Sequence, residues 1–171
     1  MNTPEEKQNT RIEICKLGFS ESLKGLAIQD ATLTTVRQCA GVLGTFSGLV
    51  ATLLGREVIP NLPNTENMMF LDWFWPALSL MTLFSSLVLV FLIIKPRSGW
   101  IFHMNGNEVI QQFADNEAGA VELDVMYKVL TKFTQDNHAG NEKLLNHLFM
   151  LLSILLALLL TQIFSWLMAL F

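Results

Sequence analysis

Charged side chains are scarce in this sequence. Asp, Glu, Lys and Arg make up 15% of its 171 residues, whereas a soluble domain carries about 25%. The basic residues form no tract, so the composition does not favour direct nucleic-acid binding. The two cysteines, Cys15 and Cys39, have no further ligand at a spacing typical of zinc sites. These shortages point away from soluble and nucleic-acid-binding classes and toward a membrane protein.

Enzyme signatures are also missing. The sequence has no nucleophile elbow, phosphate-binding loop or paired-carboxylate arrangement. His138 and His147 have no carboxylate or cysteine at ligand spacing, so no metal site is predicted. Arg97 and His103 fit the loose Arg-x(4–6)-His spacing of HEPN ribonucleases, which leaves an RNA-cleaving enzyme as a third alternative. We therefore predict a protein that is not an enzyme and that has no cofactor.

Three long apolar runs are what the sequence contains instead. Residues 148–171 carry no charge and would form a helix of about 36 Å, enough to cross a hydrocarbon core of about 30 Å. Residues 39–54 form a shorter run whose flanking Arg37 and Arg56 can snorkel, and residues 75–94 form the other. The sequence predicts an all-α polytopic membrane protein with three transmembrane helices.

The basic residues predict the orientation of these spans. Five precede the first span, one lies in the loop after it, and five lie between the second and third spans. Positive charge marks the cytoplasmic side, so we expect a bacterial inner-membrane protein with a cytoplasmic amino terminus and an external carboxyl terminus. The predicted division is a cytoplasmic amphipathic helix (1–37), first span (38–55), external loop (56–74), second span (75–94), cytoplasmic helical region (95–147) and third span (148–171).

Residues that flank the spans are predicted to anchor them. Asp72 is a candidate cap for the second span, and Pro76 would then fall in its first turn. The Pro-Arg-Ser-Gly-Trp sequence after that span favours a turn at the membrane interface over a helix. The predicted interface anchors are Trp73, Trp75, Lys95, Arg97, Trp100 and Trp166.

Two apolar stripes predict that the first and third spans continue as a cytoplasmic helical stalk. A break at Gly140, giving a cytoplasmic hairpin, is the alternative. The first stripe consists of Ile12, Phe19, Leu26 and Leu33, supported by Leu23; the second consists of Leu123, Met126, Leu130, Phe133, Asn137, Gly140 and Leu144.

Small residues form a narrow ridge on the first span: Gly41, Gly44, Gly48, Ala51 and Gly55. Because lipid tails provide no hydrophobic drive between helices, such a ridge offers close backbone contact. It predicts self-association or a pore-facing helix; the alternative is packing against the other two spans of the same chain.

Charged and polar residues near the ridge extend this prediction. Asp30 and Arg37 share the angular wedge of the glycines, and Glu142 is a candidate partner for Arg37. If the ridge lines a pore, these charges would lie at its mouth; otherwise Arg37 snorkels to lipid phosphate. Gln162, inside the third span, is expected to bond a neighbouring helix.

Three parts of the sequence together resemble a group of small bacterial three-span membrane proteins. They are the first span with its flanking residues (29–55), the 95–102 turn and the asparagines before the last span. The layout is more loosely similar to transmembrane effectors of antiphage systems, namely those of Pycsar and CBASS and the Csx28-type CRISPR accessory proteins. This resemblance implies a homo-oligomer that damages the membrane on infection. The alternative is a membrane scaffold that docks a cytoplasmic protein partner.

Overall fold

The computed structural model describes residues 4–61, 70–96, 98–102, 111, 113 and 122–170, and this part of the chain has only helices as regular structure. Helix α1 spans Pro4–Val58 and is followed by the 3-10 turn η1 (Ile59–Asn61), α2 spans Phe70–Ile94, and α4 spans Leu123–Leu170. Three helices are long and apolar enough to cross a membrane. The all-α prediction and the prediction of three potential spans are confirmed.

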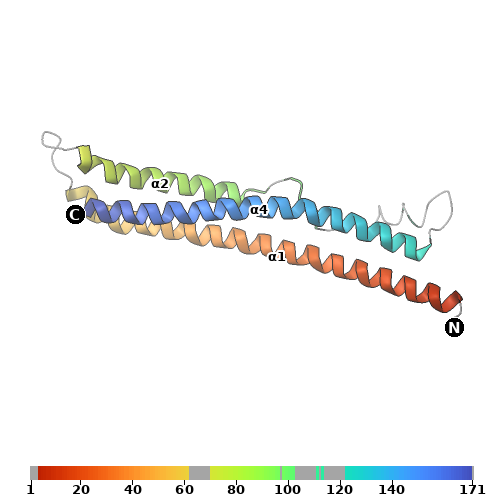
Figure 1. The fold of residues 1–171 in the computed structure, drawn as a ribbon. Coiled ribbons are helices and arrows are strands. Elements are labelled where there is room, and N and C mark those ends of the chain that lie inside the picture. Colours follow the sequence, from red (N-terminus) through yellow and green to blue (C-terminus); the bar gives the residue numbers. More distant parts are fainter. Residues whose placement is uncertain are drawn as a thin grey trace. The chain divides into compact units, whose positions relative to one another are not determined.

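The chain folds as two compact units. The first unit contains residues 1–33 and 97–145, and the second contains residues 34–96 and 146–171. Helices α1 and α4, labelled in Figure 1, contribute residues to both units, whereas α2 belongs to the second unit. Helix α4 continues through Gly140 without a break, so the alternative of a hairpin at that glycine is wrong.

The buried side of α1 repeats every seven residues. Leu26 and Leu33 are buried and Ile12 and Phe19 are half-buried, as the sequence predicts, but Leu23 is exposed. A second row of residues at 15, 22, 29 and 36 completes an alternating spacing of three and four. This row begins with Cys, Ser and Gln, which is why apolar patterning did not detect it. The spacing is that of a coiled-coil seam.

The predicted apolar stripe of α4 is confirmed only in part: Leu130 is buried, and Met126, Asn137 and Leu144 are half-buried. Leu123, Phe133 and Gly140 are exposed. Their next residues along the chain, Asp124, Thr134 and Asn141, are buried instead, and so is Leu145. Each of the three polar side chains has a hydrogen-bond partner, so its burial does not leave an unpaired polar group.

An ion-pair cluster joins the two helices of the first unit near their amino-terminal ends. The Arg11 Nε atom lies 2.8 Å from Asp124 Oδ2, and Lys128 Nζ lies 3.3 Å from the same oxygen. Burial raises the pKa of Asp124, but the hydrogen bond from Lys128 and the positive charges of Arg11 and Lys128 outweigh it, so that pKa is lowered. The carboxylate therefore favours the paired helices at neutral pH and loses this contribution in acid.

Helix α2 begins earlier than the sequence suggested. Its first residue is Phe70, so Asp72 lies within the helix rather than capping it, and Pro76 lies in the second turn rather than the first. After α2 ends at Ile94, Ser98 and Gly99 form a turn, and Gly99 has a φ of 106°. This left-handed conformation favours glycine. The prediction of a turn instead of a helix is confirmed, and its place at the membrane interface stays a prediction.

Candidate functional site

The second unit brings two glycines of the ridge into contact with other helices of the same chain. A Cβ atom added to Gly44 would lie 2.9 Å from Cγ2 of Val90 in α2, and one added to Gly55 would lie 3.3 Å from Cη2 of Trp166 in α4. Both glycines are buried. For these two positions, the absence of a side chain serves packing within the chain, which is one of the two alternatives that the ridge allowed.

The other two glycines of the ridge face open space. A Cβ atom at Gly41 or Gly48 would have no heavy atom within 4 Å among the described residues. Thr45 and Thr52 lie four residues beyond these glycines, and both are exposed. Their hydroxyls donate to the carbonyl oxygens of Gly41 and Gly48, at 3.0 and 2.9 Å. The ridge therefore divides into a packed side and an outward side.

A pair of reciprocal hydrogen bonds joins α1 to α4 inside the second unit. The Ser47 hydroxyl donates to Gln162 Oε1, and Gln162 Nε2 donates to the Ser47 carbonyl oxygen at 3.1 Å. Both side chains are fully buried. The prediction that Gln162 bonds a neighbouring helix is confirmed. In an apolar unit these bonds fix the register of α4 against α1.

We expect Gln162→Leu to destabilise the second unit by about 1–2 kcal/mol, because interhelical hydrogen bonds between membrane helices contribute about 0.6 kcal/mol each and at most about 1.7. Thr161→Leu is the matched control, since Thr161 is the neighbouring residue, is exposed, and its hydroxyl donates to the Ala157 carbonyl oxygen of its own helix. Unfolding in mixed micelles measures the difference. Equal stability of the two variants would show that the hydrogen-bonded pair contributes nothing.

Small polar residues of α2 form a row that the sequence analysis missed. Ser79, Thr82 and Ser86 are buried, and each hydroxyl donates to a carbonyl oxygen of α2 itself. Their spacing of three and four residues, within an otherwise apolar run, is the signal that could have identified them. These hydroxyls are satisfied by their own helix, so they let neighbouring helices approach closely without needing a partner.

Polar side chains of α1 and α4 hold the first unit together. The Gln29 Nε2 atom donates to the His138 carbonyl oxygen at 3.0 Å, and a Cβ atom added to Gly25 would lie 3.3 Å from His138 Cδ2. Asn141 accepts from the Ile101 backbone N–H at 3.3 Å and donates to the Ile101 carbonyl oxygen at 3.0 Å. Asn141 thereby fixes the segment that follows α2 onto α4.

The remaining predicted site residues are mostly not brought together. Asp30 and Glu142 are exposed and Arg37 is half-buried, with an Nε atom that has no partner in the described part of the chain. Arg37 and Glu142 belong to different units, so their pairing stays a prediction. The HEPN-type pair, Arg97 and His103, lies outside the described residues.

The tryptophans predicted as interface anchors have different surroundings. Trp73 is exposed, whereas Trp75 makes an edge contact with Phe164, with ring centroids 6.0 Å apart. Trp100 stacks on Phe102. Trp166 is 1% exposed and packs on Gly55. Lys95 is exposed after the last turn of α2. The depth of these residues in a bilayer stays a prediction.

Comparisons with protein-family models, curated proteins and solved structures find no match to this chain. Residues 4–61, 70–96, 98–102, 111, 113 and 122–170 contain no group of three or more His, Cys, Asp or Glu residues that could hold a metal ion. We therefore infer the function of the chain from the geometry of its helices.

Proposed function

We propose that this chain is a multi-span protein of the bacterial inner membrane that self-associates through α1, and that the oligomer perturbs the membrane or forms a pore. The observation that carries this proposal is the outward face around Gly41, Thr45 and Gly48, called the open face below. Outside the backbone of α1 itself, no atom of the described residues lies within 4 Å of the Cβ position of Gly41 or Gly48. A helix face without side chains allows close approach of a second helix backbone, which is the main source of association between membrane helices.

The surroundings of the open face suit a second copy of the same chain. Gly41 and Thr45 border a hollow of about 710 Å³, and Phe46, 51% exposed, stands beside it. A hollow with a large exposed side chain beside it suits contact with another copy, because the Phe46 ring of one copy can fill the hollow of another. The residues around the hollow are Gln38, Gly41, Val42, Thr45, Phe46 and Leu49.

In this proposal, conduction comes from the assembly and not from a single chain. Within one chain, the buried hydroxyls of Ser79, Thr82 and Ser86 are bonded to their own helix, and Ser47 and Gln162 are bonded to each other. These polar groups are already satisfied, so they do not provide a water-lined path. The resemblance in layout to membrane effectors of antiphage systems supports membrane damage as the activity and phage defence as its setting.

The distribution of basic residues supports the orientation that goes with this proposal. The first unit, with its ion pairs, would lie in the cytoplasm as a helical stalk, and the second unit would lie in the bilayer. A signal received by the stalk could reach the membrane through α1 and α4, because both helices contribute to both units.

Substitution of the two open-face glycines tests the self-association. We expect Gly41→Leu combined with Gly48→Leu to reduce the oligomer fraction by about tenfold, because the added side chains prevent close backbone approach. The control is Gly18→Leu, the same change on α1 at another glycine, whose Cβ position also has no atom of the described neighbouring residues within 4 Å. Single-molecule photobleaching in vesicles counts the subunits, and dye release from the same vesicles measures the membrane activity.

Three results are distinguishable in this experiment. Loss of oligomers and of dye release in the double variant alone supports the whole proposal. Loss of oligomers with unchanged dye release would contradict membrane perturbation by the oligomer. Unchanged subunit counts would overturn the self-association itself.

A second candidate function, a scaffold for a protein partner, is favoured by one observation. Val125, Val129 and Phe133 of α4 are each more than 40% exposed and lie four residues apart on one face of the first unit. Three apolar side chains in a row on a water-facing helix are typical of a docking surface. A monomer in vesicles that still retains a partner, and loses it on Val129→Asp, would favour the scaffold over the oligomer.

A further inference from the structure

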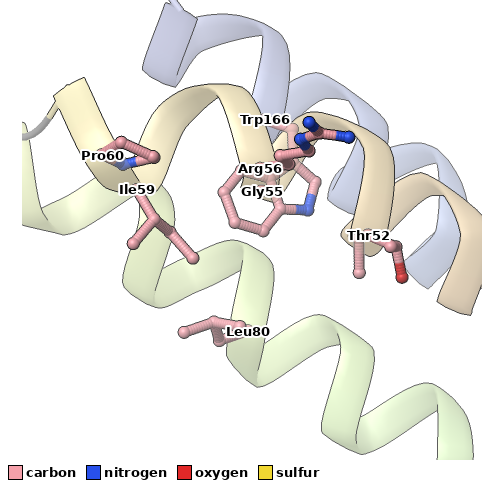
Figure 2. A pocket seen from close by; sticks show the side chains of 8 residues that line it. Thr52, Gly55, Arg56, Ile59, Pro60, Leu80 and Trp166 are labelled. Carbon is pink, nitrogen blue, oxygen red and sulfur yellow. The ribbon is translucent and has the colours of Figure 1, made fainter.

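A cavity of about 350 Å³ lies in the second unit where the charge-free stretch of α1 ends. Residues 38–55 contain no charged side chain, and Arg56 is the first charge that follows them. Helix α1 provides one wall of the cavity, Leu80 of α2 another and Trp166 of α4 a third, as Figure 2 shows. The lining residues are Ala51, Thr52, Gly55, Arg56, Ile59, Pro60, Leu80 and Trp166.

Trp166 is an unusual component of this wall. Its side chain is 1% exposed, yet its Nε1–H group has no hydrogen-bond partner in the described part of the chain. A buried donor without an acceptor costs about 1–3 kcal/mol, so such groups call for an explanation. Gly55 lets the indole approach α1, because a Cβ atom there would lie 3.3 Å from the ring. The ring is thus held in place with its donor unused.

Arg56 gives the cavity a positive charge. Its side chain is exposed, borders the cavity, and takes part in no ion pair among the described residues. Apart from Thr52, whose hydroxyl donates to the Gly48 carbonyl oxygen, the other lining residues, including Ile59 and Leu80, are apolar. A cation and an N–H donor beside apolar walls are complementary to a ligand that joins an anionic oxygen group to a hydrocarbon chain.

We propose that this cavity binds the phosphate and glycerol-ester region of an anionic phospholipid. Arg56 pairs with the phosphate, the indole N–H of Trp166 donates to a phosphate or ester oxygen, and the start of an acyl chain lies against Ile59 and Leu80. The site is separate from the open face, so its test and the self-association test can fail independently.

Native mass spectrometry of the full chain, released from micelles with added lipid, tests this site. We expect phosphatidylglycerol to be retained in preference to phosphatidylcholine, and Arg56→Gln to reduce this preference about tenfold, the usual effect of a lost charge-assisted hydrogen bond. Trp166→Phe keeps an aromatic ring but removes the donor, and should weaken retention about fivefold. Lys95→Gln is the control, because Lys95 is also exposed and basic but does not line the cavity.

Each outcome decides the proposal. Loss of the preference in Arg56→Gln with full retention in Lys95→Gln supports the site. Equal retention of the two lipids by the unmodified chain, or an equal loss in both charge variants, would overturn it. Titration with inorganic phosphate separates a lipid from a free anion: protection against unfolding by phosphate alone, without any lipid preference, would overturn the assignment to a lipid.

Discussion

Gly44→Leu is expected to destabilise the second unit strongly. A Cβ atom alone would lie 2.9 Å from Cγ2 of Val90, a distance that real contacts essentially never show, and leucine adds three further carbon atoms. Val90 cannot easily move aside, because a β-branched side chain is stiff at χ1. Overpacking of this kind costs about 1–3 kcal/mol, and we expect the upper part of that range. Unfolding of the purified chain in mixed micelles would measure the loss.

Gly48→Leu is the matched control, because Gly48 lies four residues farther along α1 and no other helix in the described part of the chain comes within 4 Å of its Cβ position. This variant should keep or slightly raise the stability of a single chain, since leucine is a better helix former than glycine by about 0.8 kcal/mol. Measurement at high dilution keeps any effect of self-association out of the comparison. If both variants have the same free energy of unfolding, the close contact between Gly44 and α2 does not stabilise the second unit.

Gly44 and Gly48 also show which part of the site could be predicted from the sequence and which part could not. The ridge of small residues was visible from the spacing alone, but Gly44 and Gly48 are four residues apart and lie on nearly the same side of α1. Which of them meets a neighbour depends on where Val90 lies, and that depends on the packing of α2. Spacing along one helix contains no information about this, so the sequence left packing within the chain and self-association as equal alternatives.

The buried stripes of α1 and α4 show the same limit of the sequence for the prediction of the fold. On α1 the row containing Leu26 and Leu33 was predicted correctly because its buried residues are apolar. On α4 the buried positions of the first unit include Asp124, Thr134 and Asn141. A prediction from the spacing of apolar residues does not select these polar side chains and assigns exposed neighbours to the buried stripe instead. Burial of these polar residues depends on specific partners such as Arg11, which only the three-dimensional arrangement supplies.

Asn141→Asp is expected to have the other large effect, this time in the first unit. Asn141 is 1% exposed, and its Nδ2 atom donates to the Ile101 carbonyl oxygen at 3.0 Å. Replacement of that donor by a carboxylate oxygen brings two acceptors together and buries a charge. An unsatisfied buried group costs about 1–3 kcal/mol, and more when it is charged. The variant should unfold more easily, and the Ile101 amide should exchange its hydrogen faster than in the unmodified chain.

The same amide-to-acid change at Asn146 provides the control, because that side chain is exposed and the charge stays in contact with solvent or headgroups. The pH dependence gives a further test of the cause. Burial opposite a carbonyl oxygen raises the pKa of the introduced carboxyl, so the variant should recover stability, relative to the unmodified chain, as the pH falls and the protonated acid can donate to Ile101. A deficit that does not change between neutral and acidic pH would mean that Asn141 acts through its shape and not through its hydrogen bonds.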